Sequence, residues 1–393
     1  TAPLCGDNRS DGCGGWCDAA TIVPWEMYET YGDIRILKKC YDMMKKWVEY
    51  QSSTDRRNYG VRTVDGKEVP EQSDLATIPY IQVQQCRGDH LTYDNSTPYI
   101  YSATAYAAHS ADILRRTAYI LGKTDDEKRY TELFENIKRA FNDAWVNDDG
   151  SVSYYGEVSS QTAHCGESVA LDGSVTRYTY YAENTPHCPS QTAYALAVDF
   201  DLIPKDKLKN TRKYFKNSIL RNNGKLTVGF LGISHLAPAL SKVGLDDVAF
   251  KLLEQEDNPS WLYSVKNGAT TIWERWNSYI AETGTFGDVS MNSFNHYSYG
   301  AIGQWFFTDI LGIRPVEFGY KSFMLSPKFG GGLTYAKGSF TSPYGKISSA
   351  WKLHDGKFTY DCTVPTNTTA TLKLPNGDIH TLVGGSYHFE INV

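Results

Sequence analysis

The sequence predicts a mainly helical domain built from helical hairpins, followed by a small antiparallel β domain. Apolar residues recur at helical spacing over much of residues 19–310, and short turns separate these stretches with no strand pattern between them. Beyond residue 312 the pattern changes to alternating apolar and polar residues, which is typical of strands. No fixed sequence period is visible, so a closed (α/α) barrel fits better than a solenoid.

The first half of the helical domain contains four predicted helices. Asp33 is a candidate N-cap for the second helix, and Gly122 is a candidate C-cap for the third. Thr124 and Glu127 resemble a capping box that opens the fourth. We expect these helices over residues 19–31, 34–51, 99–121 and 124–145, with a long polar loop over residues 52–97.

Five further helices are expected after a polar, irregular stretch over residues 151–189, at residues 191–200, 204–221, 234–243, 245–256 and 296–311. Turn sequences then separate the predicted strands, which cover residues 333–340, 346–353, 357–364 and 369–374. The chain is therefore predicted to form two domains, over residues 1–312 and 313–393.

Composition excludes several classes of partner. The net charge is -6, so there is no basic surface for nucleic acid or anionic membranes. No apolar run reaches the roughly 18 residues of a membrane helix. The eight cysteines lack the spacing of a zinc site, and no motif demands a metal or cofactor. The 28 tyrosines and 9 tryptophans suit either sugar stacking or an aromatic core.

The first candidate site is a glycine-rich segment over residues 6–18. It combines three carboxylates with an arginine and a tryptophan, namely Asp7, Asp11, Asp18, Arg9 and Trp16. Glycine lets the backbone approach a ligand closely, while arginine and tryptophan can bind and stack on a sugar. The alternative is a solvated turn in which Asp18 caps the next helix.

Two further segments lie close together in the sequence. Glu274 stands between Trp273 and Trp276, and a carboxylate beside aromatic rings is partly desolvated and a candidate general base. The alternative is a surface ion pair with Arg275. The segment 291–300 contains Asn292, Asn295, His296 and Tyr297, whose polar groups could bind sugar hydroxyls or could cap a helix.

These motifs resemble bacterial α-L-rhamnosidases of glycoside hydrolase family 78. The resemblance rests on Thr-Thr-Ile-Trp-Glu-Arg-Trp at 270–276 and Asn-Ser-Phe-Asn-His-Tyr at 292–297, and it extends over nearly the whole chain. It implies an (α/α)6 barrel with a trailing β-sandwich, and release of terminal α-L-rhamnose with inversion. Glu274 falls on the family's general base, and the two carboxyl groups are then expected about 6.5–9.5 Å apart.

The chain departs from the family pattern in its first motif. A glutamate normally follows the first arginine as general acid, but Ser10 follows Arg9 here. Asp11 is the first candidate for the acid, with Asp7 and Asp18 as alternatives. The resemblance implies that the sugar is bound by Arg9, Trp16, Trp261, Trp273, Trp276 and His296.

The first motif normally lies inside the barrel, whereas this sequence starts with it. We count roughly ten helices where six hairpins need twelve, so we expect N-terminal helices outside this sequence to complete the barrel. Two alternatives to a rhamnosidase stay open, namely an (α/α)-toroid hydrolase or lyase acting on another sugar and an inactive carbohydrate-binding relative. A periplasmic or secreted location is favoured over a cytoplasmic one.

Overall fold

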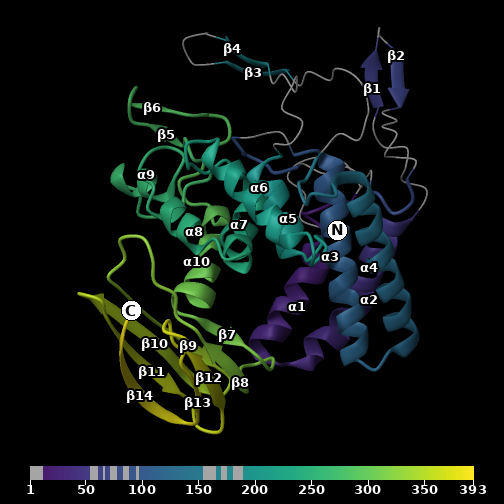
Figure 1. Ribbon diagram of the computed structural model, residues 1–393. Helices are drawn as coiled ribbons and strands as arrows, with labels where there is room; N and C mark the ends of the chain where they lie inside the picture. Colours follow the sequence, from purple (N-terminus) through teal and green to yellow (C-terminus); the bar gives the residue numbers. More distant parts are fainter. Residues whose placement is uncertain are drawn as a thin grey trace.

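The computed structural model shows helices packed above a β-sandwich (Figure 1). It describes residues 12–53, 61–64, 67–70, 78–82, 88–93, 97–153, 165–169, 175–179 and 189–393. Two short hairpins, β1 (Val61–Val64) with β2 (Lys67–Pro70) and β3 (Cys165–Val169) with β4 (Val175–Thr179), lie within stretches predicted as loops.

The first four helices lie close to their predicted bounds. They are α1 (Ala19–Tyr31), α2 (Ile34–Ser52), α3 (Tyr99–Ile120) and α4 (Thr124–Trp145). The Asp33 side chain caps α2 by accepting from Arg35 N, as predicted. The predicted capping box of α4 is wrong, because Thr124 is already helical and no side chain caps this helix. Acidic residues in the first turn of α4 stabilise its N-terminus instead, because their negative charge interacts favourably with the helix dipole.

The second group comprises α5 (Gln191–Asp199), α6 (Leu208–Leu220), α7 (Phe230–Lys242), α8 (Asp246–Leu253) and the unpredicted α9 (Trp261–Lys266). The helix predicted over residues 296–311 is instead divided into three. A 3-10 turn η3 (Ser298–Ala301) leads into α10 (Ile302–Trp305), and a π-helical turn η4 (Phe306–Ile310) ends it.

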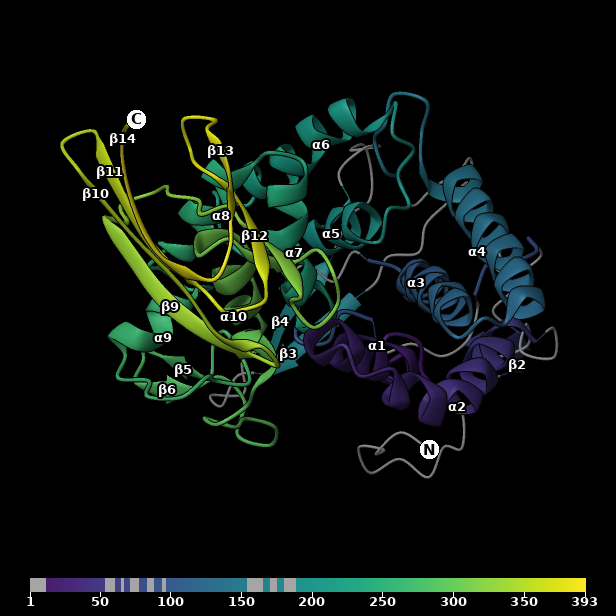
Figure 2. The ribbon, with the colours of Figure 1, turned by 90° about the horizontal axis from the view of Figure 1, so that it is seen from below.

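The helices alternate between an inner and an outer layer. Pairs α1–α2, α3–α4, α5–α6 and α7–α8 are in contact, and α1, α3, α5, α7 and α10 contact one another in turn (Figure 2). Helices α3 and α5 are buried over most of their surface, whereas α2 and α4 bury one stripe. This arrangement is the predicted (α/α) barrel architecture.

The C-terminal domain is a sandwich of two four-stranded sheets. One sheet has the order β14-β11-β10-β9 and the other β13-β12-β8-β7, and β8 pairs with β12 in parallel. The sequence predicted four of these strands, and the other four were missed. The strands are β7 (Ile313–Pro315), β8 (Ser322–Leu325), β9 (Tyr335–Ser342), β10 (Gly345–His354), β11 (Lys357–Val364), β12 (Thr369–Lys373), β13 (Ile379–Leu382) and β14 (Gly385–Asn392).

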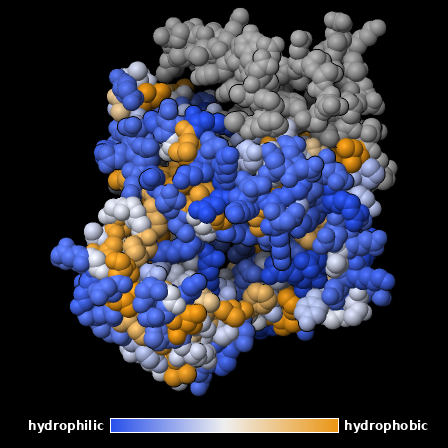
Figure 3. Space-filling model, in the orientation of Figure 1, coloured by the Kyte–Doolittle hydropathy of each residue, from blue (hydrophilic) through white to orange (hydrophobic). Residues whose placement is uncertain are grey.

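The sandwich is attached to the barrel by buried hydrogen bonds. Trp351 Nε1 donates to Ile310 O at 2.9 Å, and Ser349 Oγ donates to Leu311 O at 2.7 Å. On one face of the molecule the helical part is largely hydrophilic, while apolar side chains are more frequent over the β domain (Figure 3). Within the described ranges, no helix combines the length and apolarity needed to cross a membrane.

Candidate active site

The Glu274 carboxylate is held by a second backbone segment. Glu274 N donates to Ser293 O at 2.8 Å, and Ser293 N donates back to Glu274 Oε2 at 2.7 Å. A further backbone bond joins His296 N to Ile272 O at 2.8 Å. The His296 Nε2 atom consequently lies 4.0 Å from Glu274 Oε1, and both side chains retain some exposure, 27% and 13% respectively. One carboxylate oxygen is therefore fixed while the other faces an imidazole.

Aromatic rings from distant parts of the chain form a wall beside this pair. The Phe230 ring at the start of α7 stacks on His296 with centroids 4.9 Å apart. Phe230 also lies 5.5 Å from the His90 ring and 6.2 Å from Trp16. Trp16, which precedes α1, and His296 thus both lie against the Phe230 ring.

Asp89 fixes the position of this wall. Its buried carboxylate accepts hydrogen bonds from the backbone N–H groups of Gly229, Leu231 and Gly232 at 2.7–2.9 Å, and also from the Thr192 hydroxyl. Burial raises the pKa of Asp89, and these hydrogen bonds oppose that effect. Asp89 therefore caps α7 from a loop far away in sequence, and this explains why α7 begins four residues before the predicted Ser234.

Asp18 is an internal anchor. Its carboxylate accepts from Gly15 N at 2.7 Å, Trp47 Nε1 at 2.9 Å, Gln51 Nε2 at 3.0 Å and Ser110 Oγ at 2.5 Å, and the residue has no exposed surface. Burial raises its pKa against these hydrogen bonds. The carboxylate makes no cap hydrogen bond to α1. This placement argues against Asp18 as general acid, because no sugar oxygen can reach it.

The tryptophans predicted to bind sugar near Glu274 pack against other aromatic side chains. Trp276 is 2% exposed, stacks on Tyr299 with centroids 3.9 Å apart and donates its indole N–H to Val228 O. Trp261 packs edge-on against Trp276. Trp273 is 6% exposed and packs edge-on against Phe294. Trp276 consequently has no free face for a sugar, which corrects the sequence-based expectation for this residue. Asp7, Arg9 and Asp11 lie outside the described residues.

Comparisons with known proteins agree with this architecture. Residues 1–310 match the bacterial α-L-rhamnosidase six-hairpin glycosidase domain, and residues 312–389 match the bacterial α-L-rhamnosidase C-terminal domain. The chain belongs to the bacterial α-L-rhamnosidase family. The resemblance and the toroid-plus-sandwich fold predicted from the sequence are thereby confirmed.

Two curated α-L-rhamnosidases illustrate the similarity. That of Formosa agariphila is 34% identical over 94% of this chain, and that of Streptomyces avermitilis is 35% identical over 95%. The chain spans only 34% and 30% of these two relatives.

Solved structures give the same result. The Streptomyces avermitilis α-L-rhamnosidase complexed with L-rhamnose matches with a TM-score of 0.78 and 32% identity, covering 98% of this chain and 34% of that one. The native Aspergillus terreus α-L-rhamnosidase matches with a TM-score of 0.76 and 29% identity, covering 99% and 40%.

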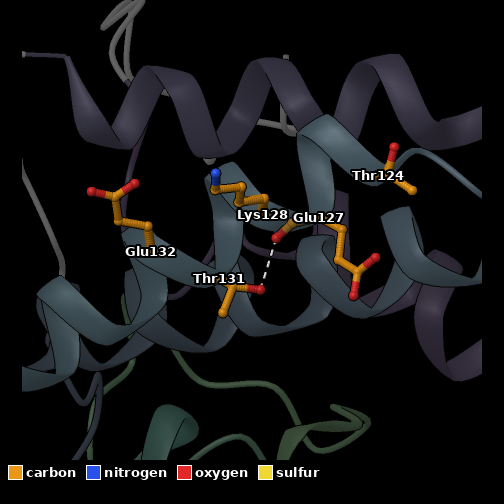
Figure 4. Close-up of a pocket in the computed structure, with 5 residues that line it drawn as sticks. All are labelled: Thr124, Glu127, Lys128, Thr131 and Glu132. Carbon is orange, nitrogen blue, oxygen red and sulfur yellow. Dashed lines mark hydrogen bonds between the residues drawn. The ribbon is translucent and has the colours of Figure 1, made fainter.

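Two other features of this rhamnosidase-family chain do not add to the site. Among the described residues, no group of three or more His, Cys, Asp or Glu side chains could hold a metal ion. A shallow pocket lies on α4, but all five residues that line it come from this one outer helix (Figure 4). They are Thr124, Glu127, Lys128, Thr131 and Glu132.

Sequence reasoning missed Asp89, His90, Phe230 and the Ser293 backbone. Asp89 and His90 lay in a stretch predicted only as a long loop, and Phe230 was placed ahead of its helix. Gly229 was the available signal, because a Cβ there would collide with the backbone of Asp89 and His90. A glycine directly before a helix can mark such a close approach of two backbones.

Proposed function

We propose that this chain forms part of an inverting α-L-rhamnosidase in which Glu274 is the general base. The observation that carries the proposal is the geometry of this carboxylate. Ser293 N–H fixes Oε2, whereas Oε1 faces His296 and the aromatic wall. The presence of L-rhamnose in the similar Streptomyces avermitilis structure supports rhamnose as the sugar.

In the proposed reaction, Glu274 takes a proton from a water molecule as this water attacks the anomeric carbon. An acid on the opposite side of the sugar gives a proton to the departing glycosidic oxygen. Asp11 is the proposed acid and Asp7 the alternative, while Arg9, Trp16 and His296 are proposed to contact the sugar. The products are rhamnose of inverted configuration and the free alcohol.

The test is release of p-nitrophenol from p-nitrophenyl α-L-rhamnoside by the full-length protein. Glu274→Gln should lower kcat by about 10³-fold, because the amide cannot accept the proton. Glu282→Gln, an exposed carboxylate in the same loop, is the matched control and should behave as the parent. NMR of the fresh product should show β-L-rhamnose first.

Equal turnover by the parent and Glu274→Gln would remove Glu274 from the mechanism. Rhamnose binding by a folded parent without turnover would instead favour a carbohydrate-binding relative, which the absence of a glutamate after Arg9 makes a specific alternative.

We also propose that another part of the full-length protein covers α1. Val23, Met27 and Tyr31 are spaced four residues apart on this inner helix and are 56%, 44% and 50% exposed. Inner helices of such a barrel normally bury their apolar faces, and the curated relatives are about three times longer than this chain. Amide exchange should show α1 better protected in the full-length protein than in this chain alone. Equal protection would contradict the proposal.

A further inference from the structure

Ser293, which donates to the Glu274 carboxylate, is preceded by a turn whose hydrogen bonds are accepted by Asp288. Asp288 Oδ1 accepts from Ser290 N at 2.8 Å, from Ser290 Oγ at 2.7 Å and from Met291 N at 3.3 Å. These bonds close a turn that ends two residues before Ser293. The position of Ser293 N–H therefore depends on the shape of this turn.

The second carboxylate oxygen of Asp288 forms an ion pair with Arg275, the residue that follows Glu274. Arg275 Nη1 lies 3.3 Å from Asp288 Oδ2 and 3.5 Å from Met291 O. The Arg275 side chain is only 20% exposed. Within the described part of the chain, the buried Nε of Arg275 has no hydrogen-bond partner. Asp288 is also the one acidic residue that forms an ion pair with Arg275 among the described residues. Hydrogen bonds from Ser290, together with Met291 N–H and the charge of Arg275, hold the pKa of Asp288 below its usual value, so it is ionised at neutral pH.

Asp288 thus connects the segment that contains Glu274 and Arg275 to the turn that precedes Ser293. On one side it anchors Arg275, which directly follows Glu274, and on the other it shapes the turn that delivers Ser293 N–H to Oε2. If the ion pair is lost, the turn and Arg275 can separate, and the carboxylate loses the donor that fixes its orientation. A displacement of about 1 Å at a reacting group can cost a hundredfold in rate.

We infer that Asp288, acting through Arg275, is a positioning residue for Glu274. This inference rests on the proposed function, in which Glu274 is the base. Asp288 contacts Arg275 and the turn at Ser290 and Met291, so we assign it a role in orienting the base and not in binding the sugar.

The test uses Asp288→Asn in the full-length protein with p-nitrophenyl α-L-rhamnoside. Asparagine keeps an oxygen that can accept the turn hydrogen bonds but removes the charge that holds Arg275. We expect kcat to fall about tenfold to a hundredfold while KM changes less than about twofold, because binding contacts remain and alignment is lost. Glu282→Gln again serves as the control and should retain the parent kcat.

Arg275→Gln provides an independent check on the pathway. If Asp288 acts through Arg275, the double variant should have about the same kcat as the worse single variant. Multiplied losses, or a fall confined to KM, would overturn the inference. So would a crystal structure of Asp288→Asn in which Ser293 N still lies 2.7 Å from Glu274 Oε2.

The two proposals fail in different ways. A parent that does not hydrolyse the substrate, or a fully active Glu274→Gln, removes the proposed function and with it the role of Asp288. A parent that depends on Glu274, combined with an unimpaired Asp288→Asn, leaves the function intact and overturns only the positioning role.

Discussion

Glu26 on α1 carries a carboxyl group whose surroundings oppose its ionisation. Glu26 is an exposed residue by its surface area, but the neighbouring helices desolvate its carboxyl group and raise the pKa of Glu26 to about 7, and the nearby charges of Glu29 and Asp199 add to this effect. His235 opposes it, and its Nδ1 lies 2.6 Å from Asp199 Oδ2. The group of Glu26 on α1, Asp199 on α5 and His235 on α7 therefore contains a carboxyl group that titrates near neutral pH.

This shift predicts a pH-dependent stability. The folded protein holds a proton on Glu26 up to pH of about 7, whereas the unfolded chain releases it near 4.5, so stability falls as the pH rises between these values. Glu26→Gln removes this loss. We expect a melting temperature about 2 °C above the parent at pH 8 and no difference at pH 4.5, measured by calorimetry.

The exposed Glu135 on α4 offers a matched control, because Glu135→Gln removes a carboxylate that faces solvent. A gain for Glu26→Gln that is equal at both pH values would contradict a titration of Glu26.

The site residues also show which parts of the candidate site can be predicted from one sequence. Glu274 and His296 could be predicted together because their motifs are distinctive and closely spaced. Trp276 belongs to the same motif as Glu274, and Asp18 belongs to the first motif, yet the fold turns both into the interior, and no local pattern shows which member of a motif is buried. Asp89 acts on backbone groups about 140 residues away, a contact that the sequence does not reveal.

At the scale of elements, the N-terminus of α7 depends on a close fit to the segment 88–93. Gly229 packs directly on the backbone of Asp89, His90 and Thr92, so any Cβ at this position collides with main-chain atoms that cannot rotate away. His90 O also accepts from Phe230 N at 2.9 Å. The fit at Gly229 thus sets the distance between two elements that both supply the aromatic wall.

Gly229→Ala should therefore affect both stability and the site. We expect the free energy of unfolding in urea to fall by about 2 kcal/mol, since overpacking forces the backbone to shift. Turnover of p-nitrophenyl α-L-rhamnoside should fall as well, because Phe230 moves with the helix.

Gly122→Ala is the comparison, since a Cβ at Gly122 meets nothing within 4 Å although the residue has φ of +69°. A loss of stability in Gly229→Ala no larger than in Gly122→Ala would indicate that backbone contact at α7 is unimportant.

Local signals predicted some elements well and others poorly. Helix α2 combines a strong apolar stripe with a cap within its own sequence, and its predicted bounds agree with the structure to one residue. The short strands β7 and β8 were missed because they derive their pairing from distant β12 and from each other, not from a local hairpin signal. The π-helical turn of η4 likewise has no sequence pattern of its own.

At the scale of the whole molecule, the β-sandwich holds the two ends of the helical domain. Near the last helices, Lys328 Nζ lies 2.7 Å from Asp246 and 3.0 Å from the fully buried Asp309. Near the first helix, the Phe318 ring lies 4.9 Å from Tyr28 and 5.4 Å from Trp25, and Gly319 N donates to Glu29 O. The small domain therefore stabilises the arrangement of helices on which the candidate site depends.

The contact between Phe318 and α1 also has a consequence during synthesis. Trp25 leaves the ribosome long before Phe318, and at about 5–20 residues per second the delay is roughly 15–60 s. Throughout that interval α1 lacks the ring that packs on its tryptophan, and an early helix with uncovered apolar surface is a target for chaperones. The packing of Phe318 on Trp25 is thus a late contact for this helix.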